Sequence, residues 1–365
     1  MGSVLRRAGE VAGAPPDAAA LRLQLDRAAY RAQQWSIRFP IATLRRLLAR
    51  VSANGPPPEP AAIAAVEARY QALLERDLAN VSAGLYPRAL LFQIPFGAYA
   101  WTLPQLLGDL PRVMRRMWAR SYDELPPEAE PERYPEYFRR TFHWQTDGYL
   151  SRRSAELYDL GVELLFAGTA DVMRRQVIPP ISRFLAAAGE RDARLLDVGC
   201  GTGRTLRQIA TAHPGLRLFG LDLSPYYLQT ARTVLEDVAD VSLVAENAER
   251  MPFRDGYFAV VSSVYLFHEL PRPARRRVLA EMYRVLRPGG LLVIEDSAQL
   301  AESGDLAFFL WRFAADFHEP FYRDYVRDDL AVALKVAGFA VEEVETQFVA
   351  KVLTARKPLT APTGG

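Results

Sequence analysis

The feature that most constrains the fold is the segment Leu195 to Gly203, which reads LLDVGCGTG. It is a short apolar run that ends in three alternating glycines, and a stretch with helical apolar spacing follows over Arg204–Ala212. Glycine adopts backbone dihedrals that side chains forbid, and it lets the main chain approach a ligand closely. In an open parallel sheet, ligands bind where such a turn follows a strand. The segment therefore favours an α/β fold with a ligand site at its glycines.

The rest of the C-terminal half repeats this alternation of strand and helix. We predict strands over Arg194–Val198, Leu216–Leu221, Val241–Ala245, Phe258–Val264 and Leu291–Ile294, with helices over Arg204–Ala212, Pro225–Val238 and Pro273–Leu286. Such alternation predicts a parallel sheet with helices on both faces. After a helix over Tyr325–Ala337, two extended segments (Val341–Phe348 and Lys351–Ala355) predict an antiparallel hairpin at the sheet edge. The expected fold is a Rossmann-like, seven-stranded, mostly parallel sheet.

The N-terminal half has helical patterns and prolines but no series of strands. Two helices are separated by Gly55–Pro60, a third begins at Thr102 as its N-cap, and two more cover Ser151–Phe166 and Thr169–Ala188. We therefore expect a disordered tail over residues 1–20, an all-helical domain over 21–169, a ligand-binding α/β domain over 170–358 and a flexible tail over 359–365.

Composition excludes several classes of protein. The net charge is only +2 and no basic patch stands out, so we expect no nucleic-acid partner. The single cysteine, Cys200, cannot form an intramolecular disulfide. We expect a cytoplasmic protein without a signal peptide. The segment Leu85–Leu107 is apolar, but its prolines argue against a spanning helix. That segment either packs against the other domain, contacts a membrane surface, or forms the entrance for an apolar substrate.

Two other glycine-rich nucleotide motifs do not fit. The dinucleotide fingerprint G-x-G-x-x-G requires a third glycine, which would fall on Arg204 or Leu206 in the two possible registers. A phosphate-binding P-loop requires a Gly-Lys-Ser/Thr sequence that does not follow here.

The pattern D-x-G-x-G-x-G, starting at Asp197, resembles motif I of class I S-adenosylmethionine (SAM)-dependent methyltransferases. Three further segments agree in order and spacing: Asp222 at the end of the second predicted strand, Glu246–Phe253 (ENAERMPF) and Arg287–Ile294 (RPGGLLVI). The resemblance is to the small-molecule branch that includes the ubiquinone/menaquinone C-methyltransferases. It covers residues 170 to 356 and leaves the helical half unassigned.

The resemblance implies SAM as cofactor and S-adenosylhomocysteine as its product. It implies that Asp222 accepts hydrogen bonds from the ribose hydroxyls, for which a carboxylate is suited. Asn247 stands where the family usually has Asp, and its amide oxygen can still accept from the adenine amino group. The implied cofactor-binding residues are Asp197, Gly199, Cys200, Gly201, Gly203, Asp222, Leu223, Asn247, Ala248, Ser263 and Tyr158.

In this family the acceptor lies beyond the fourth and fifth strands. His268 is our first candidate for a general base, since imidazole exchanges a proton near neutral pH; the alternative is a structural histidine that caps the loop before Pro271. Tyr265 and Glu295 are the other candidate catalytic residues. Two aromatic segments either bind the acceptor or form a packing seam between the domains. Their candidate substrate-binding residues are His143, Trp144, Trp311, His318 and Tyr322.

The histidines at 143, 213, 268 and 318 are scattered along the sequence without ligand spacing, so we expect no metal. The expected function is methyl transfer to a small, apolar or aromatic molecule. The alternatives are a SAM-binding module whose helical half recognises a partner, a SAM-domain enzyme with other chemistry, and methylation of a protein. The sequence gives no indication of the oligomeric state.

Overall fold

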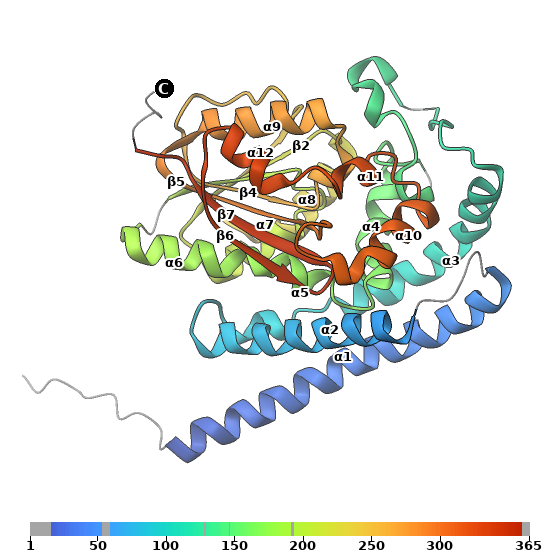
Figure 1. Ribbon diagram of the computed structural model, residues 1–365, viewed down its shortest axis with the longest axis horizontal. Coiled ribbons are helices and arrows are strands. Elements are labelled where there is room, and N and C mark those ends of the chain that lie inside the picture. The colour runs from blue at the N-terminus through green and yellow to red at the C-terminus, as the bar shows by residue number, and fades with distance from the viewer. Residues whose placement is uncertain (1–15, 53–58, 128, 146, 191–192, 360–365) are drawn as a thin grey trace, which may run out of the picture.

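A computed structural model describes residues 16–52, 59–127, 129–145, 147–190 and 193–359. Its centre is one seven-stranded sheet in the order β3-β2-β1-β4-β5-β7-β6 (Figure 1). The first five strands pair in parallel, whereas β7 is antiparallel to both β5 and β6. The strands are β1 (Arg194–Val198), β2 (Arg217–Asp222), β3 (Val241–Ala245), β4 (Phe258–Val264), β5 (Leu286–Ser297), β6 (Ala340–Gln347) and β7 (Ala350–Arg356). The predicted fold, including the antiparallel hairpin, is confirmed.

The central strands of the sheet are covered on both faces: successive side chains of a strand point to opposite sides, and nearly every residue of β1 and β4 is buried. Leu196 and Ile294 enter one core with helices α9 and α12, whereas Leu195 and Val293 enter the other core with α6, α7 and α8. The helices of the α/β half are α6 (Ile178–Ala188), α7 (Arg204–Ala212), α8 (Pro225–Val234), α9 (Arg272–Val285), α10 (Ala307–Asp316), α11 (Tyr322–Tyr325) and α12 (Leu330–Val336). Continuous apolar strands such as β4 are therefore the expected sequence of a sheet covered on both sides.

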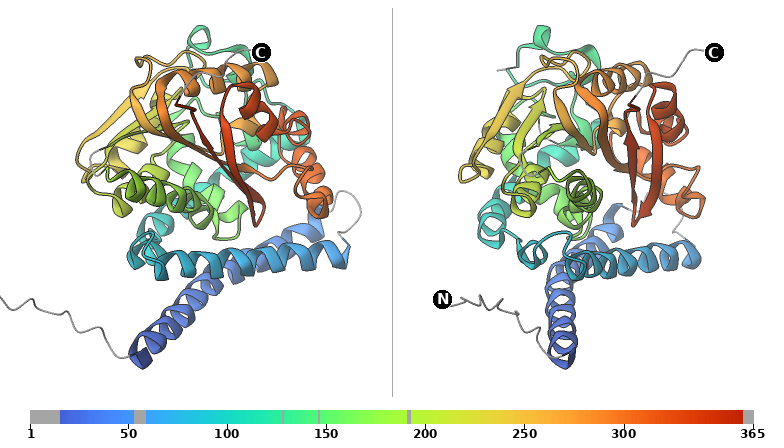
Figure 2. Two further views of the ribbon diagram at one scale, coloured as in Figure 1. Left: turned by 60° about the vertical axis from the view of Figure 1, so that its left-hand side comes forward. Right: turned by 90° about the vertical axis from the view of Figure 1, so that its left-hand side faces the viewer.

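The region before the sheet is helical, as predicted, but its boundaries differ. It comprises α1 (Pro16–Ser52), α2 (Pro60–Ser82), α3 (Phe96–Ala119), α4 (Arg152–Leu165) and α5 (Ala170–Arg174), with short 3₁₀ turns between them. Helix α1 crosses α2, and one end of it projects away from the rest of the molecule (Figure 2). The predicted helix over Thr169–Ala188 is divided into α5, a 3₁₀ turn and α6.

Two predictions about this region are wrong. Helix α3 begins at Phe96 and not at Thr102. Thr102 lies inside the helix and does not cap it, because the Thr102 hydroxyl donates to the carbonyl of Ala98 (2.9 Å) one turn back. Pro104 and Pro111 lie inside the helix. The expected N-terminal tail is shorter than predicted, since residues 16–20 already belong to α1. Residues 1–15 and 360–365 lie outside the described part of the chain.

No helix in the described ranges is long and apolar enough to cross a membrane. The segment Leu85–Leu107 divides between a 3₁₀ turn (Arg88–Phe92) and the first half of α3.

A buried ion pair attaches α2 to the α/β half. Asp77 is fully buried, and its carboxylate accepts from Arg175 Nε (2.7 Å) and from the hydroxyl of Tyr30 (2.5 Å). Tyr86 and Gln176 also donate to this carboxylate. These donors come from α1, from the loop after α2 and from the turn before α6. The carboxylate of Asp77 therefore holds four segments of the chain together.

We predict that Asp77→Asn destabilises the whole chain. The substitution leaves the buried Arg175 guanidinium without its counter-charge, which typically costs about 3–5 kcal/mol of unfolding free energy. The matched control is Glu75→Gln, which removes a surface partner of Arg27 and Arg31 and should change stability by about 0.5 kcal/mol or less. Urea unfolding followed by circular dichroism measures the unfolding free energy of both variants. Equal effects of the two substitutions would contradict the role of the hydrogen bonds around Asp77, here called the clamp at Asp77.

Candidate active site

The strand order reverses beside β1, whose neighbours are β2 and β4. Chain connections leave this point in opposite directions, and a crevice opens at the carboxyl ends of the strands. The glycine-rich turn lies there, and Gly201 adopts a positive φ of 53°. A Cβ added to Gly201 would meet no atom within 4 Å, and this residue lines the cavity in the crevice. The turn therefore leaves room for a ligand against bare backbone.

Asp222, at the end of β2, holds this turn in place. Its Oδ2 accepts from the backbone N–H of Gly201 (2.9 Å), and its Oδ1 accepts from that of Ser224 (2.8 Å). Burial raises the pKa of Asp222 to about 6, although both hydrogen bonds favour the charged form. The carboxylate lines the cavity and keeps further lone pairs that a ligand hydroxyl can use.

The far end of this cavity is formed by the loop after β3 and by the helical half. Asn247 and Ala248 line it, and Asn247 Oδ1 accepts from the backbone N–H of Glu249 (2.8 Å). Tyr137 and Phe138 line the same cavity, and the Tyr137 hydroxyl donates to Glu249 (2.6 Å). A segment far earlier in the chain thus covers the cavity, which the sequence analysis missed.

The remaining predicted cofactor residues divide into two groups. Leu223 and Tyr158 line the cavity with Gly199. Asp197 and Ser263 are buried below it and connect β1 to β4, through Ser262 Oγ donating to Asp197 (2.7 Å) and Ser263 Oγ donating to the Val198 carbonyl (2.7 Å). Burial raises the pKa of Asp197 to about 7.

Gly203 and Cys200, which were also predicted to bind the cofactor, do not line this cavity. Gly203 is the N-cap of α7, where a Cβ would meet Leu235 at 3.0 Å, so a side chain would disturb the packing of α7 on α8. Cys200 is buried and lines a second cavity described below.

Several known proteins are similar to this chain in amino-acid sequence. Residues 195–290 match the family described as "Methyltransferase domain". An O-methyltransferase of Aspergillus nomiae is 35% identical over 162 residues, which are 42% of this chain and 67% of that protein. A demethylmenaquinone methyltransferase of Geobacillus sp. is 31% identical over 177 residues, 43% of this chain and 75% of that protein. The chain belongs to the class I SAM-dependent methyltransferases.

A solved structure of a SAM-dependent methyltransferase from Aquifex aeolicus is also similar. It is 20% identical, with a TM-score of 0.38, over 48% of this chain and 88% of that one.

The crevice of this methyltransferase fits its cofactor, SAM. Bare backbone at Gly201 accommodates a close approach, the Asp222 carboxylate offers acceptors to a ribose diol, and Asn247 with Ala248 provides the wall for a base. When bound, SAM supplies a methyl group already activated on a sulfonium.

A second, larger cavity of about 470 Å³ adjoins the cofactor cavity. Both cavities are lined by Tyr158, Gly199, Gly201, Val264, Tyr265 and Glu269. Apolar side chains from α3, α4 and α10, and from Phe317 directly after α10, form much of the wall of this second cavity: Leu106, Leu107, Leu110, Val113, Leu157, Val162, Phe313 and Phe317. Helix α3 was predicted from the sequence, but no role was assigned to it.

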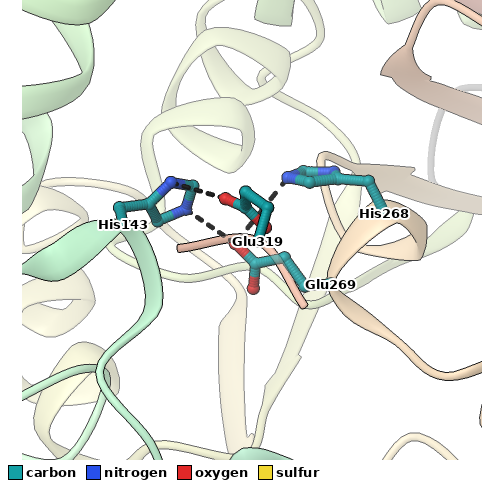
Figure 3. A group of neighbouring side chains, drawn as sticks. All are labelled: His143, His268, Glu269 and Glu319. Carbon is teal, nitrogen blue, oxygen red and sulfur yellow. Dashed lines mark hydrogen bonds and ion pairs between the residues drawn. The ribbon is translucent and has the colours of Figure 1, made fainter. Parts of the chain in front are cut away.

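Two histidines and two glutamates meet at one side of the second cavity (Figure 3). This group, here called the His–Glu cluster, consists of His143, His268, Glu269 and Glu319. The first three line the cavity. The sequence spacing of the histidines gave no indication of this group, because the fold brings together two loops that are distant in sequence.

The orientation of both imidazoles is fixed by hydrogen bonds. His268 Nδ1 lies 2.7 Å from Asp296 Oδ1, so its Nε2 faces Glu269 Oε1 at 3.8 Å. His143 Nε2 lies 3.1 Å from the same Glu269 oxygen. Burial opposes the charged imidazolium, but the neighbouring carboxylates outweigh it and raise the pKa of His143 to about 10 and that of His268 to about 9.

Two residues beside the cavity adopt strained backbone. His143 has a φ of 53° and Tyr265 a φ of 57°. Bulky side chains seldom adopt positive φ, and such residues often occur at functional sites. Tyr265, one of the candidate catalytic residues, lines both cavities.

Other predicted residues lie away from the acceptor cavity. Glu295 is fully buried and lines neither cavity, and burial raises its pKa well above the usual range. Trp311 packs against the main core under Arg327, and His318 stacks on Tyr122. Tyr322 is buried, with its hydroxyl next to Ser297 Oγ. For Trp311, His318 and Tyr322 these contacts favour the packing seam. The side chain of Trp144 lies outside the described part of the structure.

We predict that Asp222→Ala weakens binding of SAM and S-adenosylhomocysteine by roughly 10- to 100-fold. This range corresponds to the net loss of one hydrogen bond to a charged group, worth about 1.5–3 kcal/mol. The control is Asp237→Ala, which removes only an exposed partner of Arg207. Isothermal calorimetry measures both affinities, and undiminished binding by a folded Asp222→Ala variant would rule out this carboxylate as a cofactor ligand.

Proposed function

We propose that this methyltransferase methylates a small molecule with an apolar or aromatic body. The observation that carries the proposal is the apolar cavity of about 470 Å³ that shares a wall with the cofactor cavity. Ligand pockets for small molecules typically enclose roughly 300–1,000 Å³. A cavity of this size can enclose a ring system and is too confined for a folded protein or a duplex.

The distribution of polar groups gives the acceptor an orientation. The shared wall includes Gly201, Tyr265 and Glu269, so the reacting atom of the acceptor lies at this end. Its apolar body then extends along the leucines of α3 toward Phe313. Positioning supplies much of the catalysis here, since the methyl donor is already activated and only alignment is required.

His268 remains our candidate for a general base, on the basis of its geometry, once its imidazole, whose pKa the neighbouring carboxylates raise to about 9, has lost its proton. Its Nδ1 is held by Asp296, so Nε2 is the nitrogen directed toward Glu269 and the cavity. Tyr265, whose hydroxyl donates to Met173 Sδ (3.1 Å), provides the wall between the cofactor and the acceptor.

A cytoplasmic location stays a prediction from the sequence.

The direct test is turnover with SAM and a panel of phenols, quinols and polyketide-like rings, compared with charged metabolites. Mass spectrometry follows whether a product gains a methyl group. The proposal expects methylated ring compounds. Conversion without this gain would favour a SAM-domain enzyme with other chemistry, and cofactor binding without any conversion would favour a binding module. Methylation restricted to charged metabolites would contradict the proposed acceptor class.

We predict that Leu110→Glu raises the KM for an apolar acceptor by roughly 10-fold or more, because it places a carboxylate in an apolar wall. The matched control is Leu103→Glu on the same helix, where a leucine of similar exposure lies outside the cavity lining (38% and 40% exposed, respectively). Steady-state kinetics give KM, and calorimetry shows that the affinity for S-adenosylhomocysteine is unchanged in both variants. Equal KM values in the two variants would contradict acceptor binding along α3.

A further inference from the structure

The His–Glu cluster contains more ligand chemistry than an acceptor pocket requires. One donor atom from each of its four residues lies within 4.8 Å of all the others. The side chains point toward one another from three separate segments (Figure 3). They are the short 3₁₀ turn Phe142–Trp144, the 3₁₀ turn Phe267–Glu269 after β4, and the loop between α10 and α11. Charged side chains in solvent generally lie apart, so it is unusual that three loops bring these four side chains to one point.

Glu319 provides independent evidence for a ligand. It is only 3% exposed, and within the described residues neither of its carboxylate oxygens accepts a hydrogen bond. Its Oε1 lies 2.6 Å from His143 Nδ1, but this ion pair lacks the direction of an N–H···O hydrogen bond. Within the described residues His143 is its one ion-pair partner, so this buried carboxylate keeps lone pairs that no hydrogen bond satisfies, which is costly. A cation can satisfy a carboxylate without the direction that a hydrogen bond needs.

The partners behind the cluster are those of a metal site. Histidines that ligate metals usually donate their other ring nitrogen to a carboxylate, which fixes the ring and its tautomer. Asp296, which is fully buried, has this position at His268 Nδ1 (2.7 Å). The Tyr149 hydroxyl donates to Glu269 and thereby orients that carboxylate. Two of the four candidate ligands therefore have such outer partners.

We propose that the His–Glu cluster binds one divalent transition-metal ion. Two imidazoles with two carboxylates suit Zn²⁺, Co²⁺, Fe²⁺ or Mn²⁺ better than the harder Mg²⁺ or Ca²⁺, which prefer oxygen ligands alone. One divalent cation balances the two carboxylates when both imidazoles are neutral. Metal–ligand bonds of about 2.1 Å require only small side-chain movements from the separations seen here, since ligand atoms around such an ion lie roughly 3–3.4 Å apart.

The position of the ion indicates how the acceptor is selected, and this part of the inference rests on the proposed function. His143, His268 and Glu269 line the acceptor cavity, and Glu269 also lines the cofactor cavity. An ion at this point faces the reacting end of the acceptor. With the ion bound, His268 is a ligand and no longer a general base, and the ion itself stabilises the oxyanion of the acceptor. It therefore selects acceptors that carry an oxygen donor beside their apolar body, such as a phenol or an enol.

The experiment measures metal binding by the full-length, tag-free chain, independently of turnover. The chelator-stripped protein is titrated with Zn²⁺, Co²⁺ and Mg²⁺ by calorimetry, and bound Zn²⁺ and Co²⁺ are counted by elemental analysis after gel filtration. We expect one Zn²⁺ or Co²⁺ per chain, a visible Co²⁺ spectrum typical of imidazole ligation, and much weaker binding of Mg²⁺. Absence of stoichiometric binding, or Mg²⁺ binding as tight as Zn²⁺, would overturn the proposal.

Variants locate the site. Glu319→Gln and His143→Gln should each weaken Zn²⁺ binding by at least roughly 10-fold, since loss of even an outer partner costs about 10- to 100-fold. His213→Gln is the control, because His213 lies near Ser182 and outside the cluster. Neither Glu319 nor His143 lines the cofactor cavity, so affinity for S-adenosylhomocysteine should be retained and shows that each variant is folded. Zn²⁺ affinity unchanged by either cluster variant would place the ion elsewhere and overturn the proposal.

The two proposals fail separately. Zn²⁺ binding without methylation of any ring compound leaves the metal site in place and removes the proposed acceptor class. Methylation by chelator-stripped protein at an undiminished rate removes the role of the ion in acceptor binding and leaves the methyltransferase activity intact.

Discussion

The carboxylate of Asp222 is the interaction on which the site depends. It binds the backbone of the glycine turn at Gly201 and that of Ser224, the residue that caps helix α8. Ser224 Oγ in turn donates to the carbonyl of Tyr149 (2.5 Å), and the Tyr149 hydroxyl donates to Glu269. A continuous series of hydrogen bonds therefore runs from the cofactor cavity through the helical half to the His–Glu cluster. Loss of the carboxylate would disturb both cavities.

This series explains why the helical half is part of the site and does not merely precede it. Tyr137 and Phe138 cover the cofactor cavity, helix α3 provides the apolar acceptor wall, and His143 completes the His–Glu cluster. The clamp at Asp77 holds this half against the sheet through buried hydrogen bonds. In the site that we propose, the carboxyl end of the sheet holds the cofactor, and the helical half shapes the space for the acceptor.

The sequence predicted those parts of the structure that depend on local pattern. The bounds of β1, β3, β4 and α7 are as predicted, because the apolar strand residues and the turn sequences between the elements leave a local signal. Asp222 was found because its place after β2 is set by the strand itself. The helical pattern of α3 was recognised, but its start was misplaced, since Thr102 donates back into the helix instead of capping it.

The His–Glu cluster could not be predicted in the same way. His143 lies in a segment without periodicity, and its φ of 53° depends on contacts with distant loops. Glu319 lies in an aromatic insert whose tryptophan and tyrosine attracted the prediction instead. The same insert does contribute to the acceptor cavity, but through Phe313 and Phe317. Only the path of the chain in three dimensions brings these residues to the end of β4.

The most direct measurement is a crystal structure of the full chain with S-adenosylhomocysteine. The account predicts the ribose at Asp222, the base between Asn247 and Tyr137, and the sulfur at Gly201, facing an acceptor cavity bounded by α3. A ligand whose sulfur points away from that cavity, or a helix α3 that fills it, would contradict the claim that the two halves build one active site.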